Sequence, residues 1–250
     1  MMRLRDAHLP PASAVIFDKD GVLVDFQARW LAITEARLGA LSLRMPLQVS
    51  ECESLKALWG VRGDRIDPTG PLVTGGRIEV IALAAGHLYK RGTPYLDGRA
   101  LIEAAFDEAE NQEKLQRFIK PTGELRPALE ALRARGIKLA VATTDLTARA
   151  EHDLFFLGIS AYFDVVLGVD TVAHNKPHPD LFLAACHRLG VAPQEAWMVG
   201  DALNDMRMAR AAHAGGAIGV RSGISSGELL APEADLVLSG IWELPSRLED

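Results

Sequence analysis

The sequence has few cysteines, no long apolar run and no excess of basic residues. Its two cysteines, Cys52 and Cys186, lack the spacing of a metal motif and suit a reducing cytoplasm. Residues 1–11 contain no apolar signal region, and the longest apolar stretch, around 80–85, is too short to cross a bilayer. With a net charge of −6, the chain lacks the basic balance that favours binding to nucleic acid or anionic membranes. We therefore expect a cytoplasmic protein without either partner, in which local cations, a metal or backbone amides meet any anionic substrate.

What the sequence does contain is a short apolar run that stops at two carboxylates. Residues Ala14–Phe17 are apolar at successive positions and too few for a helix, which predicts a strand buried on both faces of a parallel sheet. While the chain stays extended, Asp18 and Asp20 share one face and Lys19 points away from it. Gly21 then permits a sharp turn. Two carboxylates held this close are hard to ionise together unless a strong cation lies beside them.

Two sequence patterns divide the rest of the chain. Helical spacing dominates up to about residue 120, with helices expected at 27–41, 47–59, 78–90 and 98–119 and a loop at 60–76. Strands then alternate with helices, and we expect these strands at 137–142, 165–169, 196–199, 217–220 and 236–238. Such alternation predicts an α/β fold with a doubly wound parallel sheet, whose strands end at one shared edge. We expect a core made of 1–25 and 121–250, with an all-helical domain inserted at 26–120.

Polar side chains follow several of these strands and should meet at that edge. They are Asp18, Asp20, Thr143, Thr144, Asp145, Lys176, Asp201, Asn204 and Asp205. Mg²⁺ prefers oxygen ligands and is commonly held by one or two carboxylates, which Asp18 and Asp201 could supply. A phosphoryl group needs cations and donors around its oxygens, such as Lys176, the Thr143 hydroxyl and nearby amides. An aspartate can attack phosphorus as a covalent nucleophile, and a second carboxylate can move protons.

These motifs, in this order, resemble the four-motif signature of the haloacid dehalogenase (HAD) superfamily. The matching residues are Asp18-Lys19-Asp20-Gly21-Val22, Thr143, Lys176-Pro177 and Gly200-Asp201 with Asp205. The inserted helical segment resembles the cap of the phosphoglycolate phosphatase-like branch. Core and cap together cover nearly the whole chain, so the resemblance implies a HAD-like, Rossmannoid core with an inserted cap.

The resemblance also implies a role for each acid. Asp18 would be the nucleophile that forms an aspartyl-phosphate, and Asp20 the general acid and base. Mg²⁺ would be bound by the carboxylates of Asp18 and Asp201 and by the main-chain carbonyl of Asp20, while Asp205 orients the metal's waters. Because dehalogenases lack an acid at the position of Asp20, its presence speaks for phosphate chemistry.

The remaining motif residues are implied to bind phosphate. Thr143 and the backbone at Thr144 would hold phosphate oxygens, and Lys176 would neutralise charge between the phosphate and the nucleophile. The expected function is that of a Mg²⁺-dependent phosphatase for a small phosphorylated metabolite, with phosphoglycolate as the substrate that the resemblance suggests. A phosphomutase of the β-phosphoglucomutase kind and a non-catalytic binding protein of the same fold are the alternatives.

Two groups of cationic side chains lie outside these motifs. Arg62, Arg65 and Arg77 of the inserted segment are candidates for contacts with a second anionic group of the substrate, although surface arginines are also common. His174 and His178 flank the Lys176 motif and could suggest a metal pair. We interpret them instead as solvated loop histidines, because an oxygen-rich site needs no imidazole.

Overall fold

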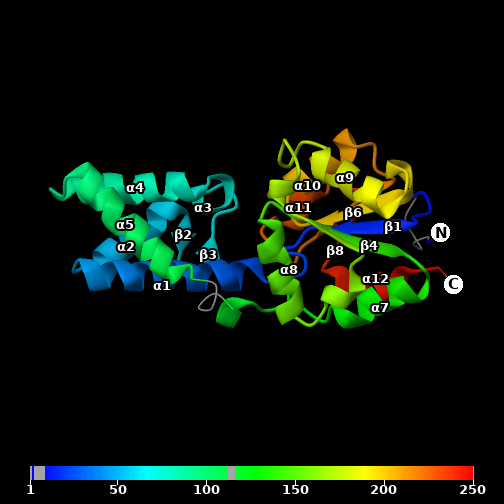
Figure 1. Ribbon diagram of the computed structural model, residues 1–250, viewed down its shortest axis with the longest axis horizontal. Helices are drawn as coiled ribbons and strands as arrows, with labels where there is room; N and C mark the ends of the chain where they lie inside the picture. The colour runs from blue at the N-terminus through cyan, green and yellow to red at the C-terminus, as the bar shows by residue number, and fades with distance from the viewer. Residues whose placement is uncertain (1, 3–8, 112–115, 250) are drawn as a thin grey trace. The chain divides into compact units, whose positions relative to one another are not determined.

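The computed structural model describes residue 2 and residues 9–111 and 116–249, which fall into two compact units (Figure 1). One unit takes in the chain up to residue 26 and from 119 onward, and the other comprises 27–118. Among the described residues, no helix combines the length and the apolar character needed to cross a membrane.

A six-stranded parallel sheet forms the centre of the first unit. Its strands are β1 (Ala14–Phe17), β4 (Lys138–Ala142), β5 (Val165–Leu167), β6 (Ala196–Gly200), β7 (Gly216–Val220) and β8 (Leu236–Leu238). They lie in the order β5-β4-β1-β6-β7-β8. From β1 the sheet grows towards β4 on one side and towards β6 on the other, so the strand order reverses at β1. Open α/β sheets bind their ligands beyond the carboxyl ends of the strands at this kind of switch point.

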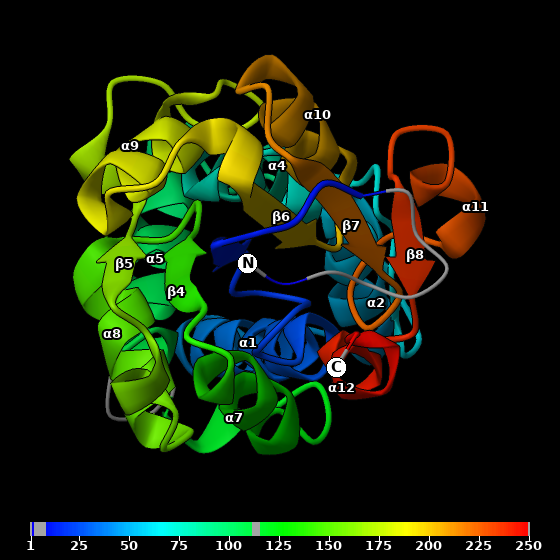
Figure 2. The ribbon, with the colours of Figure 1, turned by 90° about the vertical axis from the view of Figure 1, so that its right-hand side faces the viewer.

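Helices cover both faces of this sheet (Figure 2). They are α7 (Arg126–Ala134), α8 (Thr147–Phe156), α9 (Asp180–Leu189), α10 (Leu203–Ala211), α11 (Gly227–Leu230) and α12 (Leu244–Arg247). Alternate residues of β1 point to opposite faces of the sheet. Val15 and Phe17 pack in one core with residues of α7 and α12, and Ala14 and Ile16 pack in the other with residues of α9 and α10. Burial on both faces explains why the strand is apolar throughout. The doubly wound parallel sheet predicted from the sequence is thus confirmed.

The described residues of the second unit are helical, apart from one very short hairpin. Its elements are α1 (Phe26–Arg44), α2 (Val49–Trp59), β2 (Val61–Arg62), β3 (Arg65–Ile66), α3 (Pro71–Thr74), α4 (Arg77–Lys90), α5 (Tyr95–Ala109) and the 3₁₀ turn η1 (Gln116–Phe118). Its core is built around Trp59 and Phe106, which are fully buried and meet edge to face at 5.7 Å between ring centroids. The helix expected at 98–119 ends earlier, at Ala109, and part of that prediction falls on 112–115, outside the described residues.

Candidate active site

The strand register brings the predicted site residues to one level of the sheet. Phe17, the last residue of β1, pairs with Val141 of β4 and with Val199 of β6. The Asp18 amide extends this ladder by donating to the Val199 carbonyl at 2.8 Å. Residues that follow these three strands therefore leave the sheet side by side, as expected at the carboxyl edge of a parallel sheet.

Lys176 joins two of the acidic residues. Its ammonium lies 2.7 Å from Asp18 Oδ1 and 2.7 Å from Asp205 Oδ1, and all three side chains are buried. Asp205 also accepts a hydrogen bond from the Ala202 amide at 3.1 Å through its other oxygen. A buried ammonium that donates to two carboxylates has a fixed position, because each bond is charge-assisted and water is excluded.

Burial changes the acidity of this group of side chains. Desolvation raises the pKa of Asp18 to about 7, against the opposing effect of Lys176, and the charges of Asp205 and Asp20 raise it further. Desolvation, together with the charge of Asp18, also raises the pKa of Asp201 well above its usual value. For Lys176, desolvation acts to lower the pKa, but the carboxylates of Asp18 and Asp205 outweigh it, so the pKa is raised and the ammonium stays charged.

Asp201 is enclosed by backbone from two distant parts of the chain. Its Oδ2 accepts a hydrogen bond from the Ile224 amide at 2.7 Å. Gly21 and Gly223 pack so closely against the carboxylate that a Cβ at either position would overlap it. Gly223 and Ile224 were not among the residues predicted for the site, because they follow β7 and no motif marks the loop after that strand. Their approach to Asp201 depends on tertiary packing.

The acidic residues fit a divalent cation. The carboxylates of Asp18, Asp201 and Asp205 offer oxygen atoms that lie within 4.8 Å of one another. When all three acids are ionised, they outnumber the single ammonium of Lys176, which contacts Asp18 and Asp205, so the group then carries an excess of negative charge. An ion with oxygen preference and double charge would offset that excess, and Mg²⁺ has both properties.

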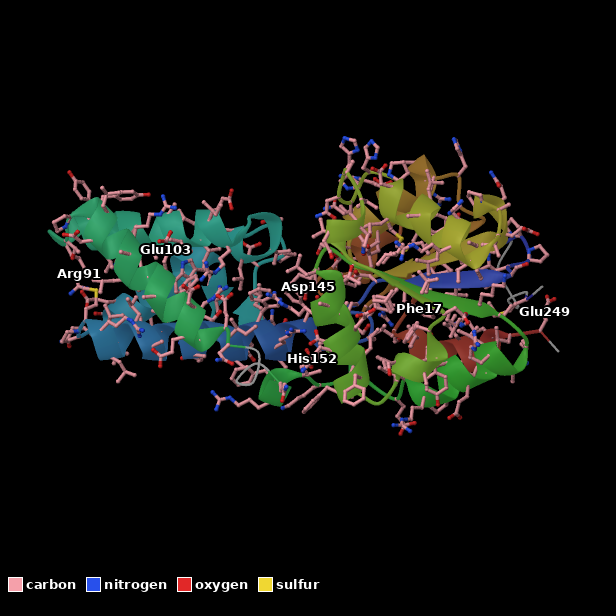
Figure 3. The ribbon with its side chains drawn as sticks, viewed as in Figure 1. Phe17, Arg91, Glu103, Asp145, His152 and Glu249 are labelled. Carbon is pink, nitrogen blue, oxygen red and sulfur yellow. The ribbon has the colours of Figure 1, made fainter. Side chains whose placement is uncertain are left out.

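Thr143 and Thr144 follow β4 at the same edge. Thr143 is buried, and its hydroxyl accepts a hydrogen bond from the Asp145 amide at 3.2 Å. Because α8 begins only at Thr147, the amides of Thr144 and Asp145 belong to the loop that precedes this helix. Asp145 lies in this loop at the carboxyl end of the sheet (Figure 3).

Lys19 departs from the sequence prediction. The alternation of side chains along a strand predicted that it points away from Asp20, yet its ammonium contacts the Asp20 carboxylate and is fully buried. The reason is that the strand ends here: the amides of Leu23 and Val24 both donate to the Lys19 carbonyl, so the chain turns instead of staying extended. Asp20 nevertheless stays near enough to Asp18 for its charge to act on it.

The three arginines of the second unit do not form one group. Arg62 and Arg65 are exposed and face each other as a cross-strand pair of the β2–β3 hairpin. Arg77 opens α4 and forms an ion pair with Asp107 of α5. A role in substrate binding therefore remains a prediction for the hairpin pair, whereas Arg77 already has an anionic partner.

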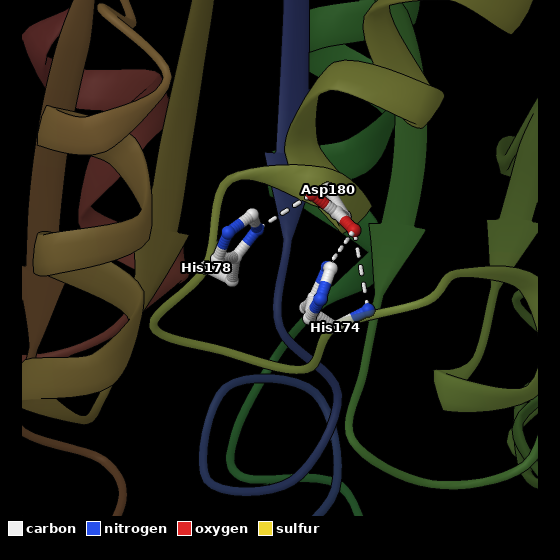
Figure 4. Close-up of side chains that lie close together, drawn as sticks. All are labelled: His174, His178 and Asp180. Atoms are coloured by element: carbon white, nitrogen blue, oxygen red, sulfur yellow. Dashed lines mark hydrogen bonds and ion pairs between the residues drawn. The ribbon is translucent and has the colours of Figure 1, made fainter.

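His174 and His178 both turn towards Asp180 (Figure 4). His174 Nδ1 lies 3.0 Å from Asp180 Oδ2, and His178 Nδ1 lies 2.6 Å from Asp180 Oδ1. Both histidine side chains are more than half exposed. These hydrogen bonds account for the convergence of the rings, and they tie together the two ends of the loop that carries Lys176.

Comparison with known proteins shows the same fold and related sequences. The family model "haloacid dehalogenase-like hydrolase" matches residues 12–213. A "Probable phosphatase IndB" of Dickeya dadantii is 42% identical over 117 residues, which is 46% of this chain and 50% of that protein. A phosphoglycolate phosphatase of Escherichia coli K12 is 38% identical over 117 residues, 46% of each chain. The chain thus spans about half the length of the curated relatives it matches.

Solved structures agree over almost the full length. A predicted phosphoglycolate phosphatase from Haemophilus somnus has a TM-score of 0.71 at 23% identity, covering 94% of this chain and 97% of that one. A putative β-phosphoglucomutase from Thermotoga maritima has a TM-score of 0.67 at 22% identity, with coverages of 94% and 97%. Because the two structures are only 23% and 22% identical to this chain, their similarity shows a shared fold and nothing further.

Proposed function

The chain belongs to the haloacid dehalogenase-like hydrolase family, and from this premise we propose that it is a Mg²⁺-dependent phosphatase of small phosphomonoesters. The observation that carries the proposal is the Lys176 ammonium, held between the Asp18 and Asp205 carboxylates at the carboxyl edge of the sheet. A nucleophilic acid, a fixed cation and further oxygen ligands are the groups that phosphoryl transfer through an aspartate requires.

We assign the binding of Mg²⁺ to the carboxylates of Asp18 and Asp201 and the main-chain carbonyl of Asp20. Asp205 would orient waters of the ion, while its Oδ1 also holds Lys176 in place. When bound, Mg²⁺ would supply positive charge to the oxygens of the transferred phosphoryl group.

Asp18 and Asp20 would divide the chemistry between them. An Asp18 oxygen attacks phosphorus, the bond from phosphorus to the leaving oxygen breaks, and Asp20 gives that oxygen a proton. Water then attacks phosphorus in the aspartyl-phosphate while Asp20 takes up the water proton. The bond to Asp18 breaks, inorganic phosphate leaves, and both carboxyl groups return to their starting states.

Lys176 and Thr143 would bind the phosphoryl group. The ammonium faces Asp18 Oδ1, so it can neutralise charge between the nucleophile and a phosphate oxygen. The Thr143 hydroxyl accepts from the Asp145 amide, which leaves its own proton free to be donated to a phosphate oxygen. The backbone at Thr144 follows directly in the same loop and would contribute an amide donor.

We propose that the helical unit acts as a cap that selects the substrate. Arg62 and Arg65 present two guanidinium groups on neighbouring strands, which suits a second anionic group such as a carboxylate. Phosphoglycolate carries such a group, and proteins of that name match about half of their length to this chain. It is therefore the substrate to test first.

A phosphate-release assay tests the proposal. The purified chain with Mg²⁺ should liberate phosphate from phosphoglycolate or another member of a panel of phosphorylated metabolites, and Asp18→Asn should abolish release. Asp97→Asn, which changes an exposed acid of α5, is the matched control and should retain activity. Normal turnover by Asp18→Asn would contradict the nucleophile assignment.

The same panel separates the alternatives. Isomerisation of a sugar phosphate without release of inorganic phosphate would identify a mutase. A chain that turns over no phosphoester, including a generic aryl phosphate, would be a binding protein instead.

A further inference from the structure

Lys19 is a fully buried lysine whose ammonium lies among three carboxylates. Its Nζ is 2.8 Å from Asp20 Oδ2 and 3.0 Å from Asp20 Oδ1, so it contacts both oxygens of that side chain. The same nitrogen is 2.8 Å from Asp153 Oδ2 and 3.3 Å from Asp145 Oδ2. Lysines are almost never fully buried unless paired, because removing the charge from water is costly. The pairing explains why the side chain is tolerated but not what the arrangement achieves.

The carboxylates around Lys19 come from three different elements. Asp20 follows β1, Asp145 lies in the loop after β4, and Asp153 lies on α8 with 1% of its surface exposed. Asp145 is the residue whose amide donates to the Thr143 hydroxyl. The ammonium therefore links the proposed acid to the phosphate-binding loop and anchors both to a buried residue of a helix.

We propose that Lys19 is a positioning residue that orients the Asp20 carboxyl group for proton transfer to the leaving oxygen, with Asp153 holding Lys19 in place. This inference rests on the proposed function. Contact with both oxygens restricts rotation of the Asp20 side chain, and either oxygen can keep the contact while the other carries the proton. General acid catalysis needs the acid within hydrogen-bond reach of the leaving oxygen, so loss of the restraint slows the step that uses the proton.

The choice of leaving group distinguishes this role from a structural one. The oxygen of 2,4-dinitrophenyl phosphate departs without a proton, whereas the oxygen of an alkyl phosphate needs one. Since kcat/KM reports the steps up to the first irreversible one, formation of the aspartyl-phosphate, it isolates the use of Asp20 as an acid. A variant with a displaced Asp20 is therefore slowed selectively on the alkyl ester, while a generally damaged site is slowed on both.

The experiment compares kcat/KM for these two esters in wild type, Lys19→Met, Asp20→Asn and the double variant. We expect Lys19→Met to lose about 10- to 100-fold on the alkyl ester, and less than about 3-fold on the dinitrophenyl ester. Because Lys19 acts through Asp20, adding Lys19→Met to Asp20→Asn should cause little further loss on the alkyl ester. Lys138→Met, which changes a lysine bonded to the Leu189 carbonyl, is the matched control.

Lys19→Met removes the ammonium that contacts the buried Asp153 carboxylate and could fail to fold. Lys19→Met/Asp153→Leu removes both charges and serves as the second variant, with the same selectivity expected. Equal losses on both esters, or losses that multiply in the double variant with Asp20→Asn, would overturn the inference while the proposed function stands. A wild-type protein that releases phosphate from neither ester would overturn both.

Discussion

Replacing the nucleophile should stabilise the metal-free protein, and the size of the effect should depend on pH. In Asp18→Asn a neutral amide takes the place of a carboxyl group whose pKa is raised from 3.8 to about 7 in the folded chain, chiefly by desolvation. Below pH 3.8 the Asp18 carboxyl group is protonated in both the folded and the unfolded chain, so it does not lower the free energy of unfolding. Between the two pKa values the unfolded chain releases this proton while the folded chain keeps it, so the free energy of unfolding falls as the pH rises. The decrease is complete above pH 7, where the folded chain also releases the proton.

The structure sets the size of this effect. A shift of about 3 pKa units corresponds to about 4 kcal/mol, which is the expected gain in unfolding free energy for Asp18→Asn at pH 8. At pH 5, about one unit above the unfolded value, the gain should be about 1.5 kcal/mol. Mg²⁺ should reverse the order of stability at pH 8, because it binds the folded wild type and loses a ligand in the variant.

Urea unfolding in EDTA at pH 5 and pH 8, repeated with Mg²⁺ at pH 8, measures these differences. A variant less stable than wild type at pH 8 in EDTA would refute the reasoning. So would a gain of the same size at both pH values, because the gain would then not come from the ionised carboxylate.

Three further changes test neighbouring parts of the site. Lys176→Met should lower the unfolding free energy by about 3 kcal/mol and abolish phosphate release, because it leaves buried carboxylates unpaired; an unchanged urea midpoint would contradict the pairing. Gly223→Ala should weaken Mg²⁺ binding about 10-fold in calorimetry, because its Cβ would overlap Asp201, whereas Gly39→Ala, with open space at that position, should not. Cys186, whose pKa burial raises to about 12, should resist iodoacetamide at pH 8 until urea unfolds the chain, as mass spectrometry would show.

The sheet was predictable because its strands are buried on both faces. The expected bounds of β1 (Ala14–Phe17) and β8 (Leu236–Leu238) agree with the structure, since apolar runs bounded by polar residues have few other interpretations. The region expected to be a loop, 60–76, contains the β2–β3 hairpin instead. A strand of two residues is too short to show the alternation of apolar and polar side chains that marks a strand in a sequence. The pairing of Arg62 with Arg65 could therefore not be predicted.

Within the site, prediction succeeded where the chain is regular and failed where it turns. Asp18 continues the β1 ladder, so its position followed from the strand. Lys19 sits one residue further on, where the chain bends back, and a rule for extended chains no longer applied. Its partner Asp153 is 134 residues away on a helix that carries no motif, so only the folded chain brings the two together.

Two buried lysines, Lys19 and Lys176, separate the environments of the two aspartates of the first motif. Asp18 and Asp20 are two residues apart and their charges repel, yet the proposed chemistry needs them to behave differently. Lys176 contacts Asp18 beside the proposed metal ligands, and Lys19 contacts Asp20 beside two acids that bind no metal in the proposed mechanism. Since each aspartate contacts a different ammonium, the protonation or ligands of one can change while the other keeps its ion pair. A nucleophile and a proton-transfer group can therefore operate from a single turn of chain.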